Sequence, residues 1–132
     1  MKYQNISVNK SKMYILIRDD VDLGHAILAA AHASLSGYLT FISNEIHAFD
    51  DKEDDEKPVF VECPTQDWSM NSFRKVVCKV SATEFEKAKT YGTNMKDYRI
   101  MVESGLGGME VAIVFKPRDN FEPFFKSLKL YK

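Results

Sequence analysis

The sequence predicts an α/β fold: one three-layer α/β/α domain built around a four-stranded mixed sheet. Short apolar segments alternate along the chain with segments of helix-forming composition, an order typical of a sheet with helices on both faces. The last two apolar segments are joined by glycine-rich residues 105–108, a connection short enough for a hairpin, so one strand pair is expected to be antiparallel. The 132 residues suffice for one such domain, residues 1–132, and are too few for two.

The first predicted strand and the first predicted helix are adjacent in the chain. Residues 13–18 begin with a continuous apolar run, as expected for a strand that is covered on both faces. Residues 23 to about 43 are rich in alanine, the strongest helix former, and small side chains allow close approach to a neighbouring element. Residues 1–11 form an N-terminal extension without the apolar segment of a secretory signal.

The middle of the chain is less regular. Residues 50–57 hold six acidic side chains in eight positions, which predicts a solvated, mobile acidic loop that can be deleted without loss of folding. Residues 59–63 fit either a short edge strand or a loop. Between residues 64 and 73, Thr65 or Asp67 is a candidate N-cap for a short helix.

The second half gives clearer boundaries. The segment Ser81-Ala82-Thr83-Glu84 is a capping box that fixes the start of a helix, and Gly92 is expected to stop it. Around this helix the sequence predicts three strands and a terminal helix, at residues 75–80, 98–102, 110–115 and 121–128.

Composition places the chain among soluble globular proteins. It is 45% hydrophobic and 28% charged, and its apolar runs are shorter than the roughly 18 residues of a membrane span. Cys63 and Cys78 match no metal motif and no disulfide framework. A reduced, cytoplasmic location, no membrane association, no cofactor and no metal are therefore expected.

The net charge of −1 is unevenly distributed. Residues 1–73 carry 6 basic and 12 acidic side chains, whereas residues 74–132 carry 12 basic and 7 acidic ones. A basic half is compatible with contact to a nucleic-acid backbone. The favoured interpretation is that these lysines lie at the surface and are neighbours in sequence but not in space.

Several segments resemble the type II peptidyl-tRNA hydrolase family. The matching segments are Ile17-Arg18-Asp19, Ala31-His32-Ala33, Arg74-Lys75-Val76-Val77-Cys78-Lys79, Met101-Val102-Glu103-Ser104-Gly105 and Leu128-Lys129-Leu130-Tyr131. They follow one another in the order in which the family has them, and together they cover the chain from residue 12 except for about residues 43–73. The resemblance implies the family's fold, cleavage of the ester bond between peptide and tRNA, tRNA as partner and a homodimer. Apolar residues between 68 and 73 also favour the homodimer.

The residues that the family uses for catalysis are only partly matched. The turn after the first strand is about two residues shorter than in the family and lacks its lysines, so His25 is the nearest equivalent of the catalytic lysine. Glu103 occupies the position of the family's aspartate. The threonines that follow in the family have no counterpart, and Ser104 is the only hydroxyl nearby.

His25, Glu103 and Ser104 are the candidate catalytic residues. A carboxylate at the end of one strand and an imidazole at the start of a helix can meet at the same sheet edge and activate a water near neutral pH. The alternative is that Glu103 and His25 are polar surface residues that never meet. The candidate substrate-binding residues are Arg18, His32, Lys75, Lys116 and Arg118.

Two other features have plainer explanations. His32 lies seven positions after His25, about 10 Å along a helix, which is too far for one metal ion to bridge. Among alanines, His32 is most simply a partly buried, hydrogen-bonded histidine. The glycines of residues 105–108 can cradle a phosphate, but they lack the lysine and hydroxyl of a P-loop, which favours a hairpin turn.

The sequence leaves two classes of function open. The first is a hydrolase acting on peptidyl-tRNA or a related ester, with His25 and Glu103 activating water. The second is a binding domain that keeps the fold without the chemistry, because fold alone does not determine function. If Glu103, His25 and the basic residues line one concave edge, the first class is favoured.

Overall fold

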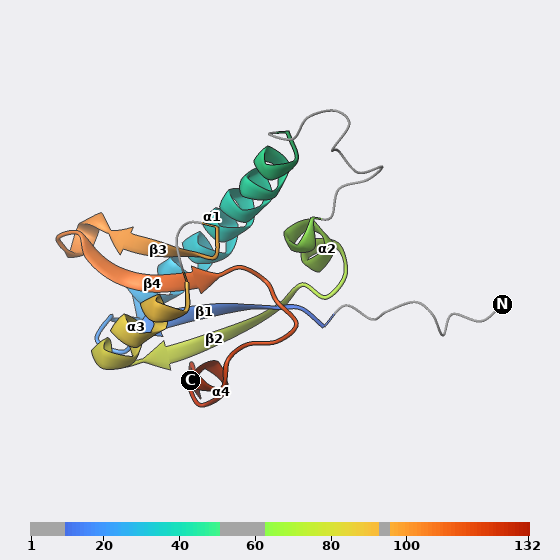
Figure 1. Ribbon diagram of the computed structural model, residues 1–132. Coiled ribbons are helices and arrows are strands. Elements are labelled where there is room, and N and C mark those ends of the chain that lie inside the picture. The colour runs from blue at the N-terminus through green and yellow to red at the C-terminus, as the bar shows by residue number, and fades with distance from the viewer. Residues whose placement is uncertain (1–9, 51–62, 93–95) are drawn as a thin grey trace.

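The computed structural model describes residues 10–50, 63–92 and 96–132, and shows a mixed sheet with helices on both faces (Figure 1). The sheet has five strands in the order β3-β4-β1-β2-β5, not four as expected from the sequence. The fifth strand has two residues, which are too few to form a recognisable strand pattern in the sequence. The strands are β1 (Lys12–Arg18), β2 (Arg74–Val80), β3 (Tyr98–Glu103), β4 (Met109–Phe115) and β5 (Lys129–Leu130).

Strand β1 lies at the centre of the sheet. It pairs in parallel with β2 along its whole length and antiparallel with β4. Five of its seven residues are buried, as the continuous apolar run predicted. The predicted hairpin is confirmed: β3 and β4 are antiparallel, with an irregularity in register after Met101. Gly107 and Gly108 close the turn with φ values of 68° and 81°, a region that disfavours other residues.

Helix α1 (Leu23–Asp50) covers one face of the sheet and runs well beyond residue 43, where the sequence placed its end. Alanines at the contact allow the helix to lie close to the strands. At Gly37 an added Cβ would be 3.0 Å from both methyl groups of Val114, so a larger residue there would require Val114 to shift. Phe41, within the predicted part of the helix, is fully buried against the sheet, and the extra turns end at Asp50, the first residue of the predicted acidic loop.

The other face is covered by α3 (Ala82–Ala88) and α4 (Pro123–Lys126). The predicted capping box is present: the Ser81 hydroxyl accepts from the Glu84 amide and the Glu84 carboxylate accepts from the Ser81 amide. A 3₁₀ turn, η2 (Lys89–Tyr91), extends α3 to Gly92, where the helical segment ends as predicted. The residues of α4 join an aromatic cluster consisting of Tyr14, Tyr91, Phe115, Phe121, Phe124 and Phe125.

A short helix, α2 (Pro64–Met70), packs beside α1. The predicted caps Thr65 and Asp67 are wrong, because Cys63 is the N-cap and Pro64 takes the first helical position. Proline suits that position because its missing N–H would have had no helical acceptor. Trp68 is buried and its indole N–H donates to the Arg74 carbonyl at 2.8 Å, which ties α2 to β2.

Some expectations concern segments outside the described residues. These are the greater part of the N-terminal extension, nearly all of the acidic loop at residues 50–57, and the strand or loop at residues 59–63. The deletion of the acidic loop therefore remains a prediction.

By length and composition alone, residues 23–48 of α1 would suffice to cross a membrane, with a mean hydropathy of 1.3. In the folded chain one side of this helix packs on the sheet. Core helices of soluble proteins can have the same length and composition, so this helix does not decide where the protein is located.

The two cysteines are free and differ in their surroundings. Burial, together with the nearby Glu84 carboxylate, raises the pKa of the Cys78 thiol to about 11, whereas Cys63 is partly exposed. Since the thiolate is the reactive form, we expect iodoacetamide at pH 8.5 to modify Cys63, and Cys78 only in denaturant. Peptide mass mapping measures this, and equal modification of both thiols in the folded protein would contradict the packing described here.

Candidate functional site

The candidate site lies at the carboxyl end of β1, where a turn leads into α1. The Asp19 amide donates to the Val80 carbonyl at 2.8 Å, which fixes the turn to the end of β2. Arg18 forms two hydrogen bonds with the Asp20 carboxylate, at 2.6 and 3.1 Å, and its guanidinium lies 5.8 Å from the Phe85 ring centroid. Arg18 is thus held by its own turn, not left free for a substrate phosphate.

Asp22, just before α1, forms a pair with His25 in the first turn of the helix. Nδ1 of His25 lies 2.6 Å from Asp22 Oδ1, and the His25 amide donates to Asp22 Oδ2 at 3.3 Å. The hydrogen bonds from His25 lower the pKa of the Asp22 carboxyl, so Asp22 is a stable anion at neutral pH. A carboxylate on Nδ1 assigns the proton to that nitrogen, which leaves Nε2 of the neutral ring as a proton acceptor.

Glu103, the last residue of β3, lies next to this histidine. Its Oε1 accepts from the Gly105 amide at 2.9 Å, which fixes the carboxylate over the turn η3 (Ser104–Leu106). A Cβ built on Gly105 would lie 3.1 Å from Glu103 Oε1 and 3.6 Å from His25 Nε2. The carboxylate and the imidazole therefore both lie close to the backbone of Gly105, which is the first of the two arrangements that the sequence left open.

Ser104 is in the same loop but is not part of this arrangement. It is exposed, and within the described residues its hydroxyl has no hydrogen-bond partner. No contact joins it to His25, so the structure gives no support for Ser104 as an activated nucleophile.

The predicted basic residues do not gather at this edge. Lys75 is paired in register with Met13, at the amino end of β1, and Lys116 and Arg118 follow β4 beside the same end. A seven-residue strand separates the two ends of the sheet by roughly 20 Å. These cations therefore do not line one edge with Glu103 and His25, and the arrangement that would have favoured the hydrolase class is not found. The antiparallel direction of β4 carries Lys116 and Arg118 away from the site, and Lys75 lies near the start of β2.

Each of these cations also has an internal contact. Lys75 lies 3.2 Å from the Phe73 ring centroid and donates to the Phe73 carbonyl, and its burial lowers the pKa of its amine. Lys116 is 3.7 Å from the Glu45 carboxylate. Arg118 pairs with Glu122 at 2.9 Å. Lys116 and Arg118 are thus each near a carboxylate, and Lys75 is held against an aromatic ring, all at the end of the sheet opposite the site.

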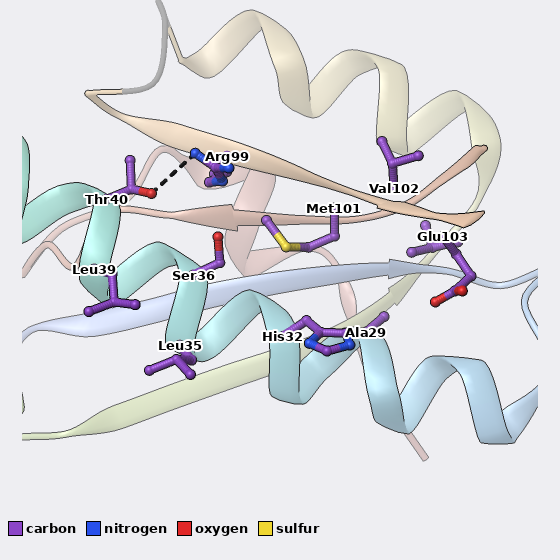
Figure 2. A pocket seen from close by; sticks show the side chains of 11 residues that line it. Ala29, His32, Leu35, Ser36, Leu39, Thr40, Arg99, Met101, Val102 and Glu103 are labelled. Carbon is purple, nitrogen blue, oxygen red and sulfur yellow. Dashed lines mark hydrogen bonds between the residues drawn. The ribbon is translucent and has the colours of Figure 1, made fainter. Parts of the chain in front are cut away.

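A groove of about 520 Å³ lies between α1 and β3 and reaches Glu103 (Figure 2). His32 lines it and is exposed, so the expectation of a partly buried, hydrogen-bonded histidine is wrong. The reason is that α1 turns its alanines, not His32, toward the sheet. Arg99 lies at the other end, where its Nη1 donates to the Thr40 hydroxyl at 3.2 Å.

Two residues of the site were not predicted from the sequence, Asp22 and Arg99. The signal for Asp22 was present: an aspartate three positions before a histidine at a helix start can bond both its ring and its amide. Arg99 had no comparable signal, because its place in the groove depends on the packing of β3 against α1. Among the described residues, no group of three or more His, Cys, Asp or Glu side chains is arranged to hold a metal ion.

Comparison with known proteins gives no match: no family model matches the chain, and neither does any curated protein sequence.

Proposed function

We propose that this protein is a hydrolase that cleaves acyl or peptidyl esters at the edge formed by Asp22, His25 and Glu103. The observation that supports this most directly is the position of His25. Asp22 Oδ1 lies 2.6 Å from its Nδ1, and its Nε2 lies close to the backbone of Gly105, whose amide donates to Glu103. An imidazole oriented by a carboxylate is a common general base in hydrolysis.

The chemistry requires one water between Glu103 and His25. Glu103 accepts a hydrogen bond from the water, and His25 Nε2 takes the water's other proton as its oxygen attacks the ester carbonyl carbon. Asp22 stabilises the imidazolium that results. The bond between the acyl carbon and the alcohol oxygen then breaks, and the imidazolium returns its proton to the leaving alkoxide.

The start of α1 provides donors for the charge that forms on the carbonyl oxygen. Within the described residues, the amides of Leu23 and Gly24 have no hydrogen-bond acceptor. Free amides at a helix N-terminus favour a negative charge. They lie in the same helical turn as His25.

The resemblance to type II peptidyl-tRNA hydrolases makes peptidyl-tRNA the first substrate to test, although the charges at the edge do not favour a tRNA body. Arg18 is bound to Asp20, and the edge also carries the acidic residues Asp19, Asp22 and Glu103. We therefore expect recognition of the acyl group and its ester, with little contribution from phosphate contacts.

This expectation can be measured with two substrates that share one ester. We expect N-acetyl-aminoacyl-tRNA and N-acetyl-aminoacyl-adenosine to be cleaved with kcat/KM values within about tenfold of each other. A family member with the full catalytic set should exceed this protein on peptidyl-tRNA by roughly a hundredfold, because one positioned acid–base group contributes that much. A preference for the tRNA ester far above tenfold, lost at high salt, would show that phosphate contacts were overlooked.

The second candidate is a binding domain without catalysis. It is favoured because the predicted basic residues already have contacts within the protein. It is also favoured because the sequence lacks the hydroxyls that the family resemblance leads one to expect. If neither ester is cleaved and tRNA does not bind at low salt, this candidate replaces the first.

A homodimer is also proposed, with exposed apolar residues near α2 as its surface. Met70 is 76% exposed and Phe73 56%, whereas Trp68, expected in the same surface, is buried. The exposed ring of Phe73 is held against Trp68, at 5.2 Å between centroids, and against the Lys75 ammonium. Light scattering at tens of micromolar should give a dimer, and Met70→Asp should give a monomer.

Leu130→Asp is the matched control, because Leu130 is also exposed but lies on β5, which pairs with the carboxyl half of β2 at Cys78, away from Phe73 at its amino end. The control should remain dimeric. A monomeric wild-type protein would contradict the proposal.

A further inference from the structure

The outer edge of β3 is unpaired in the part of the chain that the structure describes. The sheet order places β3 last, with β4 as its single neighbour. In an antiparallel pair, every second residue of an edge strand directs its N–H and C=O away from the partner. Such an edge can accept a further strand from another molecule.

Beside this edge runs the groove between β3 and α1, and its middle is apolar. Leu35 and Leu39 of α1 are 61% and 58% exposed, and Val102 of β3 is 59% exposed. Met101 forms the floor between them (Figure 2). Apolar side chains of a bound strand would remove these surfaces from water. The volume of about 520 Å³ lies within the range of roughly 300–1,000 Å³ typical of ligand pockets.

The two ends of the groove carry opposite charges. Arg99 lies at one end and Glu103 at the other (Figure 2). They are four residues apart on one strand, which corresponds to about 13 Å. A guanidinium has five N–H donors, and Arg99 uses one for Thr40, so the others remain for a carboxylate. Glu103 Oε1 accepts from Gly105, and its second oxygen remains for an ammonium group.

We propose that the groove binds a short extended peptide with free ends, which adds to β3 as an antiparallel strand. Its C-terminal carboxylate binds Arg99 and its N-terminal amine binds Glu103. A span of about 13 Å fits a peptide of about four residues at 3.3 Å per residue. Leu35 and Leu39 then contact the apolar side chains on the side of the bound strand that faces α1, whereas Val102 points away from α1 and contacts those on the opposite side (Figure 2). This binding goes beyond the proposed ester cleavage and does not require it.

The test is an NMR titration of ¹⁵N-labelled protein with the tetrapeptide Ala-Leu-Ser-Leu, whose free ends match the charges of the groove. It is compared with the same peptide amidated at its C-terminus and with the same peptide acetylated at its N-terminus. We expect the free peptide to shift amides of β3 and α1 and to bind about tenfold more tightly than either blocked form, the effect of one charge-assisted contact. In Arg99→Gln, the free and the amidated peptide should bind equally.

Leu39→Asp should weaken binding at least tenfold, and Ile27→Asp is its matched control. Both residues are exposed apolar side chains of α1, but Ile27 lies outside the groove. The proposal is overturned if the blocked peptides bind as tightly as the free one to the wild type, or if the two aspartate variants bind equally. It is also overturned if β3 amides exchange slowly without peptide because a second copy pairs with that edge. None of these peptides contains an ester, so failed ester cleavage leaves this result unaffected.

Discussion

His25→Ala is expected to lower the kcat for cleavage of N-acetyl-aminoacyl-adenosine at least about a hundredfold with little change in KM. The imidazole acts on the water, not on the bound acyl group. Its loss therefore removes an interaction that stabilises the transition state and not the bound substrate. Initial rates across a range of substrate concentrations measure both constants. A change confined to KM would show that His25 binds substrate and does not move the proton.

Two further variants separate this role from a general effect on α1. Asp22→Asn should also lower kcat, because an amide no longer stabilises the imidazolium and can reverse the orientation of the ring. His47→Ala removes a histidine from the last turn of the same helix, far from Glu103, and should leave kcat unchanged. Equal losses in His25→Ala and His47→Ala would mean that the helix, not the site, is affected.

Phe125→Ala is expected to be the most destabilising single change in the described chain. Phe125 is buried and its ring lies 4.9 Å from both Phe115 and Phe121, with edge-to-face geometry to each. Loss of a buried phenylalanine costs about 3–5 kcal/mol, a large part of the roughly 5–15 kcal/mol that stabilises a domain. Urea denaturation measures the free energy of unfolding.

Phe124→Ala is the control for this measurement. Phe124 stacks on Tyr91 at 5.1 Å but is partly exposed, so its loss should cost less than half as much. If the two variants lose the same stability, Phe125 is not more important than Phe124 for the packing of the aromatic cluster.

The fold was predictable where the sequence carries local signals. The apolar run of β1 indicated a central strand, the capping box at Ser81 located α3, and the glycines at 107 and 108 indicated the hairpin. Each of these signals depends only on residues that are neighbours in the sequence. Strand β5 was missed because two residues are too few to show the alternation of side chains typical of a strand. Its pairing with β2 depends on the packing of the C-terminus.

The candidate site was predictable only in part. That His25 and Glu103 share one edge followed from their places at a helix start and a strand end. The positions of Lys75, Lys116 and Arg118 did not follow, because a basic stretch of sequence does not reveal the direction in which each strand runs. The groove at Arg99 was also hidden, since it forms where β3 meets α1, and these elements are far apart in sequence.

The most direct test of the central claim is the release of labelled peptide from peptidyl-tRNA by the pure protein, with Glu103→Gln measured in parallel. We predict slow cleavage by the wild type and a further loss of at least about a hundredfold in Glu103→Gln, because the neutral amide no longer attracts a proton of the attacking water. Release that is undetectable in the wild type, or equal in both proteins, would contradict the assignment of this edge as a hydrolytic site.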